Sequence, residues 1–523
     1  MKTVLRMFYF ALMFLVVAVM GGVMVATVLA LLLLPILYVG WFGVSAKDAV
    51  CTRRVAFLAS LVSLLSACAV GPDHQTPVVA TPAQWHGPQP ATGQQAAAAP
   101  GSDLRQWWKG FNDPLLNRLV DMALESSPDL LVAEARLKAA RAQTVATAAD
   151  RMPQLDAQGA YQRIGTIPSS ANNLIQPGNL TFGSFIMSWE LDFFGGVRRR
   201  MEAAEADANA QQEYRRDTQV SLTAEVARQY LGLIALQQQM ETARRRQDTV
   251  REQLRLADGL FEAGMAAVTE VQTQRATVAS IEASLPALDE RIKNQRHALA
   301  ILLGSNPTDL EQRLAHLPAE LPQPPNVPLD LPADVIRRRP DIRQAEFNVA
   351  SESASIGAAV AELFPKITLS GVAAIQTQDV TNLINMTNGF YGFGPRVSIP
   401  IFQAGRLLAN LENQEAQHRE ALVTYQKTVL TAFREVEDQL VSINDETQRR
   451  QSLELALSNA RIAEQSSMSM YGEGEAELQA ALQNRRNQQD IQDDLTQSRL
   501  TWVTHYVALY KALGGGWDMN GGG

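Results

Sequence analysis

Four short segments of the chain alternate apolar and polar side chains with the period of two residues that a β-strand imposes. In residues 181–192, for example, Phe185, Met187 and Trp189 would share one face, whereas Ser188 and Glu190 would lie on the other. The pattern predicts strands near 154–165, 181–192, 366–376 and 390–401. Segments of about ten alternating residues, with aromatic side chains near their ends, are typical of strands that face lipid and lumen in turn.

Long stretches that almost lack glycine and proline predict four helices, near 197–260, 265–303, 404–471 and 475–513. Residues 406–471 contain neither residue type, and a continuous helix of that length would span roughly 100 Å at about 1.5 Å per residue. Leu422, Val429, Val436 and Ile443 follow one another at intervals of seven. This narrow apolar seam indicates left-handed coiled-coil packing, with the other helix faces open to water.

The two halves of the chain carry the same motifs in the same order. Ser127–Leu130 recurs 212 residues later as Arg339–Ile342, and Leu303-Gly304 recurs 210 residues later as Leu513-Gly514. We therefore expect a first repeat over 104–316, a proline-rich linker over 317–332 and a second repeat over 333–523. Each repeat would carry two strands and two long helices.

The predicted sheet is too small to close by itself in a membrane. A strand in lipid needs partners at both edges, and the smallest membrane barrels have about eight strands. If the four segments span a membrane, several chains must therefore share one barrel. The fold class is then an α+β membrane protein, and the alternative is a water-soluble four-stranded sheet capping a coiled coil.

Charge and composition exclude several classes of function. The formal net charge is −8, from 46 basic and 54 acidic residues, which argues against a dedicated nucleic-acid binder. The arginine triplets 198–200, 244–246 and 337–339 lie among acidic residues on predicted helices, so we expect solvated or paired faces there. The six histidines have no metal-ligand spacing, and no phosphate loop, nucleophile elbow or HExxH motif occurs. We expect no metal, no cofactor and no enzymatic activity.

The N-terminus has the character of targeting segments rather than of the fold. Residues 7–44 carry no charged side chain, and we expect residues 1–50 to be either an over-called start or a membrane hairpin. Residues 51–67 resemble a bacterial lipoprotein signal peptide, with Arg53-Arg54, a short apolar core and small residues before Cys68. Cys68 is the expected lipidation site. Residues 68–103, rich in proline and alanine, would form a tether from the lipid to the folded body.

Several motifs resemble those of TolC-like outer-membrane efflux channels, specifically the lipoprotein branch (OprM/NodT-like) that works with resistance–nodulation–division pumps. The resemblance runs from Cys68 to about Asp518. Its marks are the lipobox, Trp107–Pro114, Trp189–Asp192 with Phe194-Gly195, Leu302–Gly304, Arg339–Asp341, Ser355–Ala359, Phe364-Pro365, Ile399–Phe402 with Gly405, and Leu509–Trp517.

The resemblance implies a homotrimer with a shared 12-stranded outer-membrane barrel, to which each chain contributes four strands. It implies a periplasmic tunnel of long helices that opens when a periplasmic adaptor and an inner-membrane resistance–nodulation–division transporter dock. The chain would be a lipid-anchored exit duct for drugs or other small molecules, and the pump would choose the substrates. The alternatives are a non-conducting structural coiled-coil lipoprotein and a type I protein-secretion duct.

Functional residues are expected where each helix pair breaks. The turns around Gly264 and around Tyr471, Gly472 and Gly474 would form the periplasmic tip, and the resemblance places adaptor contact there. The alternative is that these glycines only end helices. Rings of carboxylates can gate such tunnels. Relatives carry an Asp where this chain has Glu270, and the corresponding position after the second turn is Gln483, so that ring is incomplete. The candidates near the second turn are Glu473, Glu475 and Glu477, which could equally be solvated helix-end carboxylates.

Overall fold

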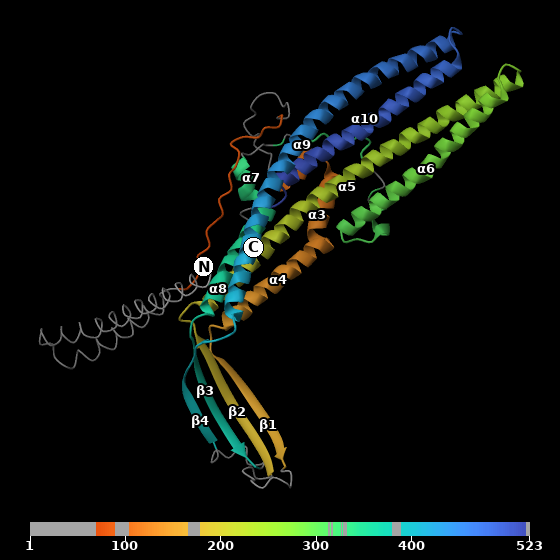
Figure 1. Ribbon diagram of the computed structural model, residues 1–523. Helices are drawn as coiled ribbons and strands as arrows, with labels where there is room; N and C mark the ends of the chain where they lie inside the picture. Colours follow the sequence, from red (N-terminus) through yellow and green to blue (C-terminus); the bar gives the residue numbers. More distant parts are fainter. Residues whose placement is uncertain are drawn as a thin grey trace. The chain divides into compact units, whose positions relative to one another are not determined.

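The computed structural model describes residues 69–88, 104–165, 178–311, 314, 317–325, 327, 332–378 and 389–518 (Figure 1). The N-terminal extension, the signal peptide and Cys68 lie outside these residues, as do residues 89–103 of the expected tether and the loops 166–177 and 379–388. The chain divides into a unit of Met1–Ala69 and a unit of Val70–Gly523. All that follows concerns the second unit.

The two halves of this unit have the same order of helices and strands. The first half contains η1 (Leu104–Phe111), α3 (Pro114–Ser126), α4 (Pro128–Ala149), β1 (Gln154–Ile164), β2 (Gly178–Leu191), α5 (Gly196–Glu262), α6 (Val268–Leu302) and η2 (Pro307–Leu310). The second contains α7 (Pro332–Arg338), α8 (Pro340–Ala361), β3 (Lys366–Thr377), β4 (Gly389–Ser398), α9 (Arg406–Gly472) and α10 (Leu478–Ala512). The strands and the four long helices begin and end within three residues of the expected bounds.

Glycines in the left-handed backbone region mark both ends of the long helices. Gly195 and Gly405, with φ of 80° and 85°, immediately precede α5 and α9. These helices have 67 residues each, and their hairpin partners α6 and α10 have 35 each. Because a helix rises about 1.5 Å per residue, α5 and α9 are each on the order of 100 Å long. Pro286 lies inside α6 without ending it.

The four strands form one antiparallel sheet in the order β1-β2-β3-β4. In Figure 1 the sheet continues from the ends of α4, α5, α8 and α9. The two middle strands come from different halves of the chain, so the pairing of β2 with β3 joins the repeats.

The hydrophobic core lies where α5 and α9 pass the shorter helices. Tyr230 of α5 is fully buried and donates a hydrogen bond of 2.7 Å to Asp113, whose other carboxylate oxygen caps α3. Trp107 stacks on Tyr510 with ring centroids 5.2 Å apart, and the Gly516 N–H donates to the Leu104 carbonyl. These contacts hold η1 and the start of α3 against α5 and α10, and they join η1 to the residues that follow α10.

The described part of the expected tether lies against the body instead of extending freely. Trp85 is buried with its ring 6.0 Å from that of Phe433, and the His86 and Gly87 N–H groups donate to the Glu437 carboxylate. The sequence-based prediction weighed only the proline and alanine content of 68–103, and it missed that Trp85 has enough apolar surface to dock the segment.

No helix within the described ranges is both long and apolar enough to cross a lipid bilayer.

Candidate functional site

The strand register assembles the alternating side chains into apolar rows across the sheet. Residues directly opposite each other share a face. Leu155 pairs with Met187, Met187 with Gly371, and Gly371 with Phe393. The next row in register contains Ala157, Phe185, Ala373 and Tyr391. This face of the sheet is therefore largely apolar, as the alternation predicted, although Thr181, Thr377 and Arg163 lie on it near the loops.

The opposite face carries most of the polar strand residues. Ser188 pairs with Ser370, and Thr368 pairs with both Glu190 and Arg396. The separation is incomplete, since Ile186, Val372 and Phe390 also lie on this face. An apolar face opposite a largely polar one is the distribution that a strand between lipid and a water-filled lumen requires.

Both edges of this sheet are open. Among the described residues, no strand pairs with the outer edge of β1 or of β4. Large apolar side chains on these edge strands are exposed, including Leu155 at 68%, Tyr391 at 89% and Phe393 at 69%. In lipid an open strand edge would leave backbone N–H and C=O groups without partners, and in water an exposed apolar edge favours pairing with another strand.

The junction between the strands and the long helices is closely packed. The Asp192 carboxylate accepts hydrogen bonds of 2.9 Å from the Val197 and Arg198 N–H groups and so satisfies donors at the start of α5. Phe194 stacks on Phe364 with centroids 4.8 Å apart, which joins the β2–α5 junction of the first repeat to the α8–β3 junction of the second.

The two expected tip turns connect α5 to α6 and α9 to α10. Gly264 and Gly474 have φ of 72° and 78°, a region that L side chains rarely adopt. The N–H of the residue that follows each of them donates to a carbonyl of the last helical turn, Leu260 in the first hairpin and Met470 in the second. The glycines thus end the helices and form the turns as well.

Exposed apolar side chains gather around these turns. Phe261 and Met265 are 45% and 72% exposed at the first turn, and Met470 and Tyr471 are 41% and 42% exposed at the second. That these exposed side chains contact an adaptor stays a prediction.

The four candidate gate carboxylates divide between the hairpins. Glu270 lies in the first turn of α6, whereas Glu473, Glu475 and Glu477 are exposed around the turn between α9 and α10. The Ser469 hydroxyl lies 3.5 Å from a Glu473 carboxylate oxygen. Their role in gating stays a prediction.

Ion pairs between the hairpins are functional candidates that sequence reasoning missed. Arg246 on α5 contacts Asp490 and Asp493 on α10 at 2.7 and 2.9 Å. Arg485 on α10 contacts Glu252 on α5 at 3.5 Å and Glu464 on α9 at 3.0 Å. Only folding brings these residues together, since more than 200 positions separate α5 from α10.

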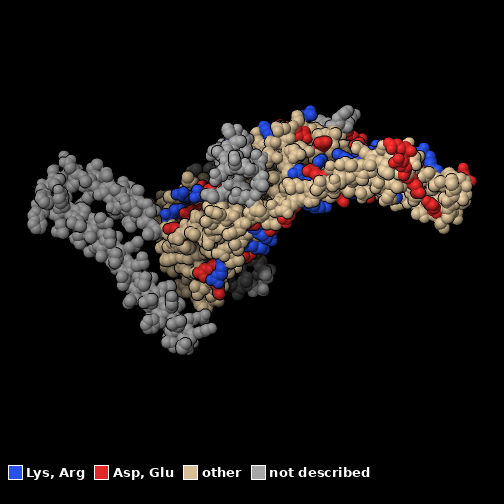
Figure 2. Space-filling model, turned by 90° about the horizontal axis from the view of Figure 1, so that it is seen from above, with Lys and Arg blue, Asp and Glu red and all other residues tan. Residues whose placement is uncertain are grey.

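The arginine triplets are paired with acidic residues, as expected. Arg198 contacts Asp192, Arg245 contacts Glu241, and Arg339 contacts Asp341 at 2.7 Å. On the face shown in Figure 2, acidic and basic side chains are interspersed over the helices and form no single basic surface.

An apolar-faced sheet with open edges, continued by the helices α5 and α9 that are each on the order of 100 Å long, is the arrangement expected of an outer-membrane tunnel. The family model for the outer membrane efflux protein matches the chain twice, over residues 119–305 and 331–515. The chain belongs to this family. It is an outer-membrane channel of an efflux pump, and its family members are channels rather than enzymes.

The chain matches individual relatives over most of their length. The chain is 34% identical to the pyoverdine export outer membrane protein OpmQ of Pseudomonas aeruginosa over 472 residues, which cover 88% of this chain and 97% of that protein. It is 28% identical to the cation efflux system protein CusC of Escherichia coli over 462 residues, 87% of this chain and 97% of that one. The solved structure of the outer-membrane channel OprN superimposes with a TM-score of 0.74 at 31% identity, covering 86% of this chain and all of the other.

Proposed function

We propose that three copies of this chain form a 12-stranded barrel and a helical tunnel that together serve as the passive exit duct of a tripartite efflux pump. The open edges of the apolar-faced sheet carry this proposal, because β1 of one copy can pair with β4 of the next until the barrel closes. A threefold arrangement makes every copy equivalent and leaves no edge exposed.

The chain supplies a path and the partners supply the energy. The tip turns at Gly264, Gly472 and Gly474, with the exposed Tyr471, are the proposed contact for a periplasmic adaptor. An inner-membrane resistance–nodulation–division transporter would then deliver small molecules into the tunnel. The relatives OpmQ and CusC are named for pyoverdine and for cations, so a common channel fold accompanies different cargoes.

The anchor and the gate complete the proposal. Lipid at Cys68 would hold the mature chain at the membrane, and multiple acyl chains give a stable anchor. The carboxylates Glu270, Glu473, Glu475 and Glu477 would be tripled by the symmetry, which would favour cations at the tunnel entrance.

A matched pair of substitutions tests the barrel. Phe393→Arg places a charge on the apolar face of β4, whereas Phe390→Arg places it on the opposite face, three residues away. A charge on the lipid face of a barrel costs roughly 2–4 kcal/mol at the membrane midplane. We expect the wild-type chain and Phe390→Arg to give a trimeric particle in detergent and conductance in planar bilayers, and Phe393→Arg to lose most of both. A monomeric wild-type particle would overturn the shared barrel, and a trimer that never conducts would favour a structural lipoprotein.

A further inference from the structure

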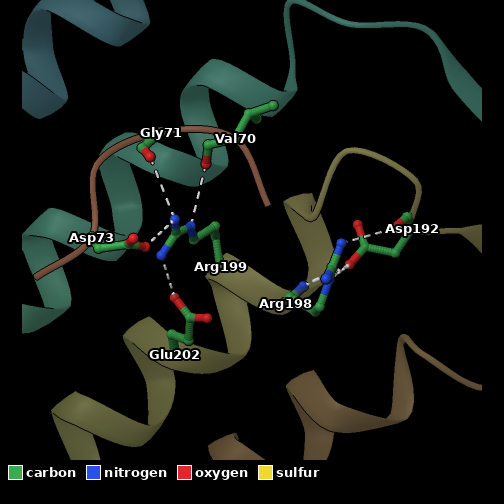
Figure 3. Close-up of polar contacts among 7 residues, drawn as sticks. All are labelled: Val70, Gly71, Asp73, Asp192, Arg198, Arg199 and Glu202. Carbon is green, nitrogen blue, oxygen red and sulfur yellow. Dashed lines mark hydrogen bonds and ion pairs between the residues drawn. The ribbon is translucent and has the colours of Figure 1, made fainter. Parts of the chain in front are cut away.

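The segment just after Cys68 is held by a single buried arginine. The Arg199 guanidinium, 6% exposed, donates to the Val70 carbonyl at 3.2 Å and to the Gly71 carbonyl at 3.4 Å (Figure 3). It also pairs with Asp73 at 2.7 Å and with Glu202 at 2.8 Å. The Val70 N–H donates to the Phe194 carbonyl at 3.1 Å, so both polar groups of the Val70 backbone are bound by the body.

The charge balance at this contact favours the docked segment. Burial alone would lower the pKa of Arg199, but the hydrogen bonds and negative charges of Asp73 and Glu202 outweigh it and raise the pKa above its ordinary value. Hydrogen bonds to charged groups are stronger than those between neutral groups.

Two glycines allow the segment to approach this closely. Gly71 has φ of 94°, and a Cβ there would lie 2.4 Å from the Gly357 Cα on α8. A Cβ at Gly357 would in turn lie 2.8 Å from the Arg199 side chain. The segment therefore crosses α8 and α5 at a point where only glycines fit.

A second attachment lies at the other end of the segment. The carboxylate of Glu437 on α9 accepts hydrogen bonds of 2.8 and 2.7 Å from the N–H groups of His86 and Gly87, beside the buried Trp85. Residues 70–88, here called the strap, are thus fixed to α5 and α8 at one end and to α9 at the other.

We propose that Arg199 is a positioning residue that binds residues 70–73 of the mature N-terminal segment near the strand–helix junction and so shortens the free tether of a lipid attached to Cys68. This inference rests on the proposed lipidation. Cys68 precedes Val70 by two residues in the sequence. Val70 itself is bound to Phe194, three residues after the end of β2.

Docking of the strap shortens the free chain between the lipid and the folded body. Without the Arg199 contact the chain would be free as far as Trp85, a tether of about 17 residues with a root-mean-square length of roughly 20–25 Å, and effective concentration falls steeply with tether length. With the strap docked at Arg199, only a few residues of free chain separate it from Cys68 in the sequence. The consequence is faster insertion and assembly of newly made chains.

Hydrogen–deuterium exchange on the full-length processed protein tests the docking. We expect Arg199→Ala to accelerate exchange of the Val70 amide at least about tenfold, while the Gly87 amide stays protected. Arg199→Lys keeps the charge but loses the forked geometry, and should give an intermediate rate. Arg200→Ala, the neighbouring position on α5, is the control and should leave the Val70 amide unchanged. An unchanged rate in Arg199→Ala would overturn the docking role.

A second measurement separates positioning from plain stabilisation. The rate at which newly made chains become trimers is followed with and without the lipid, the latter as Cys68→Ser behind an ordinary secretion signal. We expect Arg199→Ala to slow assembly severalfold only in the lipidated protein. Equal slowing in both would show a merely structural role and overturn the positioning. An intact mass without lipid at Cys68 would instead refute the proposed anchor, and the exchange result would still decide the docking.

Discussion

Arg246 on α5 and Asp490 on α10 form an ion pair of 2.7 Å that joins the two helical hairpins of one chain. With Asp493 at 2.9 Å, the same guanidinium bridges two acidic residues on successive turns of α10. If the proposed tunnel widens at its tip by separation of the hairpins, this contact has to break on opening.

Removing this bridge should favour opening. Partly exposed ion pairs contribute about 0.2–1 kcal/mol each. If each of three copies in a trimer loses one such pair, the opening equilibrium of Arg246→Ala would shift by roughly 0.6–3 kcal/mol, or about 3- to 140-fold, because 1.4 kcal/mol corresponds to about a factor of ten. Single-channel recording in planar bilayers measures the open probability. Arg245→Ala is the matched control, since Arg245 pairs with Glu241 on its own helix. Equal open probabilities for Arg246→Ala and wild type would contradict this assignment.

Asp217 on α5 should make the free energy of unfolding depend on pH. Burial, followed by the negative charge of Asp341, raises the pKa of Asp217 to about 6, although Lys511 and Arg339 oppose the shift. A raised carboxyl pKa contributes stability that is fully present below the ordinary value of 3.8 and is lost as pH rises through 6.

Asp217→Asn should therefore stabilise the protein above pH 6, by at most about 3 kcal/mol, and have little effect below about pH 4. Denaturant unfolding of the purified particle at several pH values measures the difference. Asp121→Asn on the exposed side of α3 is the control and should show no such pH dependence. A stabilisation that does not vary with pH would contradict the prediction.

The hydroxyl of Tyr230 stabilises the core through its hydrogen bond to Asp113. Both side chains are buried, and Asp113 also accepts from the Leu115 and Leu116 N–H groups. Tyr230→Phe leaves one carboxylate oxygen without its partner, so we expect a loss of about 1–3 kcal/mol in the free energy of unfolding. Tyr214→Phe on the same helix removes only an exposed contact with Arg136 and should cost far less. Similar losses in the two variants would rule out a special role for the buried bond.

The spans of the strands and long helices could be predicted because local chemistry sets them. Glycines such as Gly195 and Gly474 end the long runs, and the alternation around Phe185 fixes a face once the register is chosen. Contacts such as Arg246–Asp490 and Arg199–Asp73 join residues more than 120 positions apart, and many arginines in this chain could pair with many acids. The tip turns followed from local signals, whereas the strap and the hairpin bridges required the folded chain.

The two tip glycines permit a test that separates backbone conformation from side-chain size. Nothing lies within 4 Å of a Cβ built at Gly264, Gly472 or Gly474, so alanine fits at each position. Gly264 and Gly474 have positive φ, and alanine there costs roughly 1 kcal/mol of backbone strain and distorts the turn. Gly472 ends α9 with an ordinary φ, and alanine there should favour the helix.

If the turns bind the adaptor, Gly264→Ala and Gly474→Ala should weaken cross-linking to it and sensitise cells to pump substrates, with the particle still trimeric. Gly472→Ala should behave like wild type in both assays. Loss of efflux in Gly472→Ala to the same degree would mean that the exposed surface at Tyr471, rather than the turn conformation, determines the contact. Full efflux in all three variants would place the adaptor elsewhere, because the strained turns would then have no role in docking.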